Sequence, residues 1–509
     1  MFDELVTEAQ GGRGAGAVGG WARVENAACA RRLAGMVAML DARHAADGST
    51  EREQWYLDNW GAVSAEIGAA QQITSGAASN QLLVATALRD RLPQVAARFA
   101  DGYGTYQLMS MIVWRTALIT DPDARDAVDS ALASALSEWE PMSVAKTVAA
   151  IDAWVNQVDP HALRRTQTQA RGRSVQINVD EGEGMGSLWG SLFAPDAKAL
   201  DDRLDAIARS VCDGDGRTID QRRSDALGAL GAGADRLACL CGETDCPAAG
   251  APPVSSTVVY VIAHEDAITD ATPAAATEEA ALDGAEPARS SGRPLGELTL
   301  AEALEDPVPA GFAVTSPGVM MGGPFLPGPV LRRAVLHAAV RKIFHPGDAP
   351  PEVGYRPSRR LAEFVRCRDL TCRFPGCDVA ATECDVDHTI PYPGGATQAS
   401  NLKCLCRFHH LLKTFWGGVC GWRDRQLPDG TVYWISPGGQ TYVTRPGSRL
   451  LFPTLCQPTA PVVVVASAGE SAPSVGLTMP RRARTRSEDR RRRIDQERRL
   501  NEEARSAAA

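Results

Sequence analysis

The sequence predicts a multidomain protein, with a mainly α-helical N-terminal domain followed by a small α+β domain built around a structural metal site. Three observations lead to this prediction. The chain of 509 residues is too long for one hydrophobic core. Apolar residues recur at helical spacing over about the first 170 residues. Cysteine and histidine pairs then cluster between residues 372 and 410, at spacings typical of metal ligands.

Residues 1–264 are predicted to form the helical domain. The segment SVAKTVAAIDAWVNQV places valine and isoleucine three, four and seven positions apart, and Ser143 is a suitable N-cap. The segments DAKALDDRLDAIARSV and TIDQRRSDALGALG continue the pattern, and the second closes at Gly231. These stripes indicate core packing, and none of them resembles an active site.

A first cysteine cluster, CLCGETDC, lies just before the strand-like run STVVYVIAH. Cys239, Cys241 and Cys246 would bind Zn²⁺ if a fourth ligand arrived, and His264 is the nearest candidate. Because the spacing matches no standard zinc finger, reduced loop cysteines without a metal are the alternative.

The rest of the chain divides by composition. Residues 265–295 are acidic and rich in Ala, Pro and Thr, which predicts a linker, because they cannot bury enough apolar surface to fold alone. A compact domain is predicted at 296–450, ending in a hairpin around PDG and PGG turns. Residues 451–509 are predicted to be a disordered, Arg-rich tail, although SEDRRRRIDQERRLNEEA has the i,i+4 ion pairs of a helix.

Charge and hydropathy narrow the class of protein. The net charge of -9 excludes a chain that is basic throughout, yet residues 481–499 carry ten arginines against four acids. No stretch is long enough to span a membrane, and the N-terminus lacks the basic start and apolar run of a signal peptide. We therefore expect a cytoplasmic protein with no membrane partner, in which clustered cysteines bind metal rather than form disulfides.

Two ligand pairs predict a structural zinc site. Cys372 and Cys377 flank a Pro-Gly bend in CRFPGC, and Cys406 and His409 have the C-x-x-H spacing that a helix start accommodates. Two pairs, each close in sequence and well separated from the other, are typical of a closed tetrahedral zinc site. The exact ligand set stays open, because further cysteines lie nearby. Cys384 or Cys404 could replace one of the four ligands.

A second constellation carries candidate chemistry. Asp387 and His388 end a predicted strand, and His410 follows the zinc ligand His409 on a predicted helix. Neighbouring helix residues point about 100° apart, so the two histidines can serve different metals. Asp387 and His410 could then hold one divalent ion, which leaves His388 free to act as a general base on water.

The stretch DVDHTIPYPGG…SNLKCLCRFHHLLKT resembles the HNH endonuclease motif of the ββα-metal nuclease superfamily over about 45 residues. The resemblance implies a metal-dependent endonuclease that hydrolyses phosphodiester bonds in DNA. It implies Asp387 and His410 as ligands of the catalytic ion, His388 as general base, Asn401 as the residue that orients the base and its loop, and Lys413 near the phosphate. We expect Mg²⁺ or Mn²⁺ there, with Zn²⁺ or Ni²⁺ as alternatives, besides the structural Zn²⁺.

One departure from the pattern concerns the zinc ligands. The usual zinc-bearing motif ends in Cys-x-x-Cys-His, whereas this chain reads Cys-Arg-Phe-His-His. A histidine in place of cysteine leaves a zinc site feasible and its exact ligation open. Arginines precede the motif, and three of them are predicted to contact phosphates, with a solvated helix face as the alternative: Arg366, Arg368 and Arg373.

Upstream, DGRTIDQRRSDALGAL and CLCGETDCP resemble domain of unknown function 222, which is found ahead of HNH modules in a high-GC bacterial repeat family of the 13E12 type. This resemblance covers roughly residues 20–310 and implies an architecture without an established activity. The expected partner is DNA. Besides DNA, two further partners are considered, a second copy of the chain for paired cuts and a protein bound through the helical domain. The alternative function is a nucleic-acid-binding or mobile-element accessory protein without turnover, which uses the zinc-stabilised HNH module as a platform.

Overall fold

The computed structural model is about half helical and carries small sheets. Among the described residues, no helix is both long enough and apolar enough to cross a membrane. The described residues are 2–47, 49–139, 142–163, 174–179, 185–243, 245–248, 259–269, 293, 297–305, 316–335, 338–418, 420–464 and 478–506.

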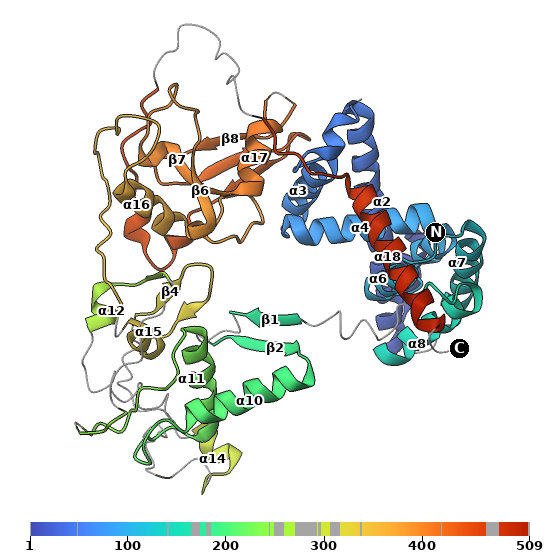
Figure 1. The fold of residues 1–509 in the computed structure, drawn as a ribbon. Coiled ribbons are helices and arrows are strands. Elements are labelled where there is room, and N and C mark those ends of the chain that lie inside the picture. Colours follow the sequence, from blue (N-terminus) through green and yellow to red (C-terminus); the bar gives the residue numbers. More distant parts are fainter. Residues whose placement is uncertain are drawn as a thin grey trace.

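The N-terminal part is a helical bundle (Figure 1). Its core is formed by buried apolar side chains between Leu33 and Ala162. The predicted helix after Ser143 is confirmed, and the Ser143 hydroxyl accepts a hydrogen bond from the Lys146 backbone N–H. The helices are α1 (Phe2–Gly11), α2 (Ala15–Asp47), α3 (Asn59–Gln71), α4 (Ser75–Arg91), α5 (Pro93–Ala100), α6 (Tyr106–Arg115), α7 (Pro122–Leu136) and α8 (Val144–Val158).

The C-terminal tail lies along this bundle as helix α18 (Arg486–Ser506) (Figure 1). Arg498 Nη1 donates to Asp159 Oδ2 at 2.6 Å, and Asn501 donates to two backbone carbonyls of the bundle. Arg486 Nε donates to Asp58 Oδ2 at 2.6 Å. The prediction of disorder is wrong for residues 478–506, because their arginines pair with carboxylates that the fold buries, those of Asp58 and Asp159, and the sequence does not show this burial. The alternative of a helix is confirmed.

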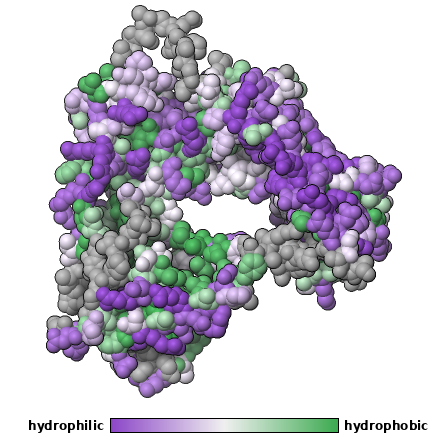
Figure 2. All heavy atoms as spheres, in the orientation of Figure 1, coloured by the Kyte–Doolittle hydropathy of each residue, from purple (hydrophilic) through white to green (hydrophobic). Residues whose placement is uncertain are grey.

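A second, smaller unit follows the bundle. Strands β1 (Ser174–Asn178) and β2 (Ser187–Ser191) form an antiparallel hairpin, which precedes α10 (Ala194–Ala208) and α11 (Ile219–Gly231). Both predicted helices are present, and α11 ends at Gly231 as expected. Exposed apolar side chains gather over the hairpin (Figure 2).

A three-stranded sheet joins segments from both sides of the acidic stretch. Strand β3 (Val261–Ile262) pairs with β4 (Gly318–Met320), which pairs with β5 (Phe325–Leu326). The predicted boundary at residue 264 therefore separates strands of one sheet. The predicted linker begins with a short helix, and its residues 270–292 lie outside the described residues. The helices of this region are α12 (Glu265–Thr269), α14 (Leu300–Glu305) and α15 (Gly328–Val335).

The C-terminal module comprises the elements from Arg359 to Thr444. Its central part has the predicted order of strand, loop, strand and helix. Strand β6 (Cys384–His388) pairs antiparallel with β7 (Leu402–Cys406), so that Asp387 lies opposite Lys403. Helix α17 (Arg407–Phe415) follows β7 directly. The expected terminal hairpin is present as a sheet of order β10-β9-β8. The remaining elements are α16 (Arg359–Asp369), β8 (Arg423–Gln426), β9 (Val432–Ile435) and β10 (Thr441–Thr444).

Helix α3 joins the bundle to the C-terminal module. Residues on every side of α3 are buried, because the helix lies between two cores. Val63 and Ile67 pack into the bundle, whereas Ala62 and Ala65 pack with the module. The Trp416 indole N–H donates to a backbone carbonyl just before α3, that of Leu57, at 3.1 Å. The predicted domain at 296–450 is therefore not independent of the helical domain.

Candidate functional site

The four predicted zinc ligands come together. The ligand atoms of Cys372, Cys377, Cys406 and His409 all lie within 4.8 Å of one another, so that they could hold a metal ion. His409 Nδ1 lies 3.2 Å from Cys406 Sγ and 3.6 Å from Cys372 Sγ, and the Cys377 and Cys406 sulfurs are 4.0 Å apart. The predicted quartet is thus confirmed as a group. The two alternative ligands, Cys384 and Cys404, do not belong to the group.

The local chain explains why these four residues meet. Gly376 adopts a φ of +74°, and a Cβ at this position would lie 2.5 Å from the Ile73 carbonyl oxygen, so the bend requires glycine. The Phe374 ring stacks on the His409 ring at 4.0 Å. Ser75 Oγ, at the start of α4, lies 3.1 Å from His409 Nε2. Because Nε2 is engaged by this hydroxyl, Nδ1 is the nitrogen that faces the thiols.

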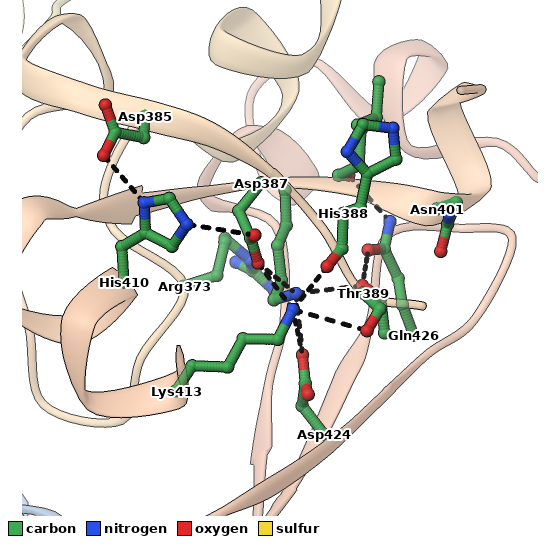
Figure 3. A network of polar contacts seen from close by, with 12 residues as sticks. Arg373, Asp385, Asp387, His388, Thr389, Asn401, His410, Lys413, Asp424 and Gln426 are labelled. Carbon is green, nitrogen blue, oxygen red and sulfur yellow. Dashed lines mark hydrogen bonds and ion pairs between the residues drawn. The ribbon is translucent and has the colours of Figure 1, made fainter. Parts of the chain in front are cut away.

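A separate polar network surrounds Asp387 (Figure 3). Its Oδ2 accepts hydrogen bonds from Lys413 Nζ at 2.6 Å and from Lys403 Nζ at 3.2 Å. Its Oδ1 lies 3.4 Å from His410 Nε2. The other nitrogen of His410, Nδ1, lies 2.8 Å from Asp385 Oδ2. The histidine therefore bridges two carboxylates, while the lysines hold the far oxygen of Asp387.

Charge in this network follows from burial and pairing. Burial alone would raise the pKa of Asp387, but Lys403, His410 and Lys413 outweigh it and hold the pKa well below its usual range. The hydrogen bond to Asp387 raises the pKa of His410, against burial. Burial lowers the pKa of Lys413, which also feels the like charge of Lys403. Asp387 therefore carries its negative charge at neutral pH.

His388 is buried beside this network, and its hydrogen bond fixes its tautomer. Thr397 Oγ1 donates its only proton to the Gly354 carbonyl at 2.6 Å. It must therefore accept from His388 Nε2, which lies 2.9 Å away. Nδ1 is then the basic nitrogen. The Tyr355 ring stacks on the imidazole at 5.3 Å, and burial lowers the pKa of His388.

Asn401 fixes the loop that follows His388. Its Oδ1 accepts from the Ile390 backbone N–H at 2.8 Å, and its Nδ2 donates to the carbonyls of Ile390 and Ala396 at 3.0 and 2.9 Å. Thr389 N–H in turn donates to the Asn401 carbonyl at 2.7 Å. The side chain thus closes the loop back toward the end of β6.

The arginine prediction fails at two of its three positions. Arg368 is 1% exposed and donates to the carbonyls of Ala399 and Leu402. Arg373 is 3% exposed and donates to the carbonyls of Arg445 and Gly430. Buried guanidinium groups that are committed to the backbone cannot contact a phosphate. Arg366 is half-buried, and its Nε donates to the Ala381 carbonyl at 3.2 Å.

Four residues of the network were not foreseen. Asp385 alternates with Asp387 along β6, and this period-two spacing is the signal that could have found it. Lys403 lies opposite Asp387 in the hairpin, and Asp424 Oδ2 on β8 forms an ion pair with Lys403 Nζ at 2.7 Å. Lys403, Asp424 and Thr397 could not be predicted from sequence, because only the tertiary fold brings them close to Asp387 and His388.

The first cysteine cluster differs from its prediction in the fourth residue. His264 Nε2 lies 3.0 Å from the Leu451 carbonyl oxygen, and its ring packs on Phe452. It is therefore not near the cluster. Instead Cys212 joins the three expected thiols: Cys239, Cys241 and Cys246. Cys212 was not predicted as the fourth ligand, because α11 separates it in sequence from the other three cysteines.

Fold and site define a multidomain protein with a helical bundle, a Cys/His cluster that could hold a metal, and a carboxylate–histidine network. The chain belongs to the family described as "Domain of unknown function (DUF222)", whose model matches residues 21–369. Relatives in Mycobacterium tuberculosis (strain ATCC 25618 / H37Rv) include the uncharacterized protein Rv2100, 48% identical over 94% of this chain and 86% of the relative. The uncharacterized protein Rv3776 is 46% identical over 94% of this chain and 88% of its own length. No solved structure matches this chain.

Proposed function

We propose that this protein is a metal-dependent endonuclease of the HNH type that hydrolyses phosphodiester bonds in DNA. The observation that carries the proposal is the placement of Asp387 Oδ1 and His410 Nε2 face to face at 3.4 Å. Next to them in sequence is His388, whose tautomer leaves Nδ1 able to accept a proton. Asp387 and His388 lie on a β-hairpin, and His410 lies on the helix that follows it directly. This is the order of elements that the ββα-metal resemblance implies.

The donor set fits a divalent cation. A carboxylate oxygen and an imidazole nitrogen suit Mg²⁺, Mn²⁺ or a transition metal. His410 contacts a carboxylate with each ring nitrogen; a bound cation would take the place of the Nε2 proton, while Nδ1–H still donates to Asp385 and orients the ring. The lysines bind the other oxygen of Asp387 and so orient the carboxylate. When bound, a divalent cation would polarise the scissile phosphate and stabilise the leaving oxygen.

The chain's own residues account for proton transfer. His388 Nδ1 takes the proton of the attacking water, and Thr397 stabilises the resulting imidazolium by accepting from Nε2–H. Asn401 holds the loop after His388 and with it the direction of the ring. Lys413 keeps Asp387 ionised, and it is tied to the backbone carbonyls of His388 and Thr389. Its predicted place beside the phosphate stays a prediction.

We assign the Cys372, Cys377, Cys406 and His409 cluster to one structural Zn²⁺. Three thiols and one imidazole form a soft, closed donor set, and all four tetrahedral positions are supplied by protein. A closed site leaves no position for substrate, so this metal would support the fold and not the reaction.

The rate of cleavage should depend on pH through His388. Burial lowers its pKa below the usual value of about 6.5, so the imidazole stays neutral at pH 7. At saturating metal, cleavage should be constant near neutral pH and fall only below a pH of about 6.5, as His388 becomes protonated. The measurement is single-turnover nicking at several pH values, with metal saturation checked at each because His410 protonation competes with the ion. An acid limb centred above about pH 7 would contradict the assignment.

The helical bundle should support the zinc site through Ser75. Ser75→Ala removes the hydrogen-bond partner of His409 Nε2. This should lower zinc affinity about 10-fold, within the range typical when a ligating histidine loses such a partner. Competition with a chromophoric chelator measures this. Ser143→Ala, which removes the cap of α8 outside the cluster, is the matched control and should leave zinc affinity unchanged.

A second candidate function is a nucleic-acid-binding protein without turnover. It is favoured by one observation, that the ammonium groups of Lys403 and Lys413 both pair with the Asp387 carboxylate, which reduces the negative charge available to a cation. Conversion of supercoiled plasmid to nicked or linear DNA, with Mg²⁺ or Mn²⁺ and with EDTA as control, separates the two. Cleavage that EDTA abolishes supports the endonuclease, whereas retarded migration of intact DNA under every ion tested supports the binding protein.

A further inference from the structure

Four thiols meet in the small unit between the bundle and the C-terminal module. Cys212 lies after α10, whereas Cys239, Cys241 and Cys246 lie in the segment after α11. Their sulfurs all lie within 4.8 Å of one another, and the Cys212 and Cys239 sulfurs are 3.4 Å apart. Cys239 is buried and the other three are half-buried.

The distances indicate one mononuclear site. A disulfide brings sulfurs to about 2.05 Å, so Cys212 and Cys239 are not bonded, and all four cysteines are free thiols. Zinc bound to four thiolates at about 2.3 Å places the sulfurs about 3.8 Å apart, and a group with one pair at 3.4 Å and every pair within 4.8 Å is compatible with that spacing. An iron–sulfur cluster distributes its cysteines over more than one iron and spreads their sulfurs further. The geometry therefore fits a single tetrahedral ion.

The surrounding chain holds the two segments together without help from the thiols. The Asp215 carboxylate accepts from Arg217 Nε at 2.9 Å and from the Leu240 backbone N–H at 2.9 Å. Arg217 Nη2 donates to the Ala238 carbonyl at 2.9 Å. The Cys239 backbone N–H donates to the Ala248 carbonyl at 2.9 Å. The loop after α11 is thus fixed against the residues that follow Cys212, which brings four thiols from two segments into register.

The unit also lacks a large hydrophobic core. Among the described residues, its fully buried apolar cluster consists of Ile207, Ala226 and Leu237, with four half-buried neighbours. Units with so little buried apolar surface are usually stabilised by a metal or by disulfides. A metal at the thiols would tie the end of α10 to the chain after α11.

We propose that Cys212, Cys239, Cys241 and Cys246 bind one Zn²⁺ ion as a second structural site that stabilises the α10–α11 unit. All four positions are protein thiolates, so the site is closed, and zinc brings no redox chemistry. The site is separate from the Cys/His cluster of the C-terminal module and does not depend on endonuclease activity.

The first test is the zinc content of the full chain, purified in reducing buffer and measured by inductively coupled plasma mass spectrometry. The wild type should hold about two zinc ions per chain, one for each closed site. Cys212→Ser and Cys241→Ser should each hold about one, and Cys420→Ser, an exposed cysteine outside both clusters, should still hold about two. A wild type with about one zinc ion, lost on substitution of Cys406 and kept on substitution of Cys212, would overturn the proposal.

A second test needs no variant and so does not depend on folding of a mutant. The native chain is alkylated with iodoacetamide before and after treatment with a zinc chelator, and the labelled peptides are identified by mass spectrometry. Cys212, Cys241 and Cys246 should be protected until the chelator is added, while Cys420 should be labelled throughout. Labelling of the half-buried trio at the rate of Cys420 before chelation, or a Cys212–Cys239 disulfide in the reduced native protein, would refute the site.

Discussion

Replacing His388 with alanine is expected to lower the rate of metal-dependent plasmid nicking by about 10²- to 10⁴-fold, the range that a general base contributes. The substitution removes the only side chain in the proposed mechanism that takes the proton from water. It leaves Asp387 and His410 in place, so metal binding should persist. The measurement is the single-turnover rate at saturating Mg²⁺ or Mn²⁺, with bound DNA quantified separately.

Thr397 supplies the matched control for this prediction. Thr397→Val removes the acceptor of His388 Nε2–H and frees the ring to adopt the other tautomer, which should cost about 10-fold in rate, the value of one lost hydrogen bond. Thr397→Ser keeps the hydroxyl and should cleave at nearly the wild-type rate. All variants should hold as much zinc as the wild type. Equal cleavage by wild type and His388→Ala would refute the assigned base, and equal rates for both Thr397 variants would refute the role of Thr397 in fixing the tautomer.

The Cys/His quartet was predictable because its signal is local. Cys372 and Cys377 are joined by one glycine-dependent bend, and Cys406 and His409 by the first turn of one helix. Each half is therefore defined by short-range geometry that the sequence shows directly. The same holds for α8, whose stripe and N-cap lie within one segment. Only the joining of the halves needed the fold.

The errors arise where long-range contacts decide. An arginine beside the motif suggests a phosphate ligand. However, the Arg368 guanidinium donates to the carbonyls of Ala399, just before β7, and Leu402, at its start, which lie 31 and 34 residues further along the chain. Cys212 is 27 residues from Cys239 and has no spacing motif of its own. Lys403 reads as an ordinary exposed strand residue, yet its pairing opposite Asp387 buries it completely. In each case the pairing of distant segments sets the role.

The largest effect on stability is expected from loss of the zinc ion that we propose for the Cys/His cluster. Structural zinc binding contributes about 10–16 kcal/mol, which is as large as the whole free energy of unfolding of a typical domain, about 5–15 kcal/mol. Cys372 and Cys406 lie inside the core of the C-terminal module. Cys406→Ser should therefore lose one zinc ion and abolish cooperative unfolding of the module. Tryptophan fluorescence reports this transition, because Trp422 and Trp434 are buried in the same core.

His409 offers a sharper form of the experiment. His409→Ala should lose the zinc ion and the transition, whereas His409→Cys restores a soft fourth ligand in a C-x-x-C spacing and should keep both. Cys420→Ser, at an exposed thiol, should behave as the wild type. A zinc-free His409→Ala that still unfolds cooperatively at the wild-type temperature would show that packing alone holds the module.

Unfolding of the module should also weaken the helical bundle without destroying it. The bundle has its own core, including Leu82 and Phe99, so a second transition should persist in Cys406→Ser. However, α3 buries Ala62 and Ala65 against the module, and these faces become exposed when the module unfolds. Because α3 contributes to both cores, the bundle transition should move to lower temperature, and a bundle that melts unchanged would show that the two cores are energetically independent.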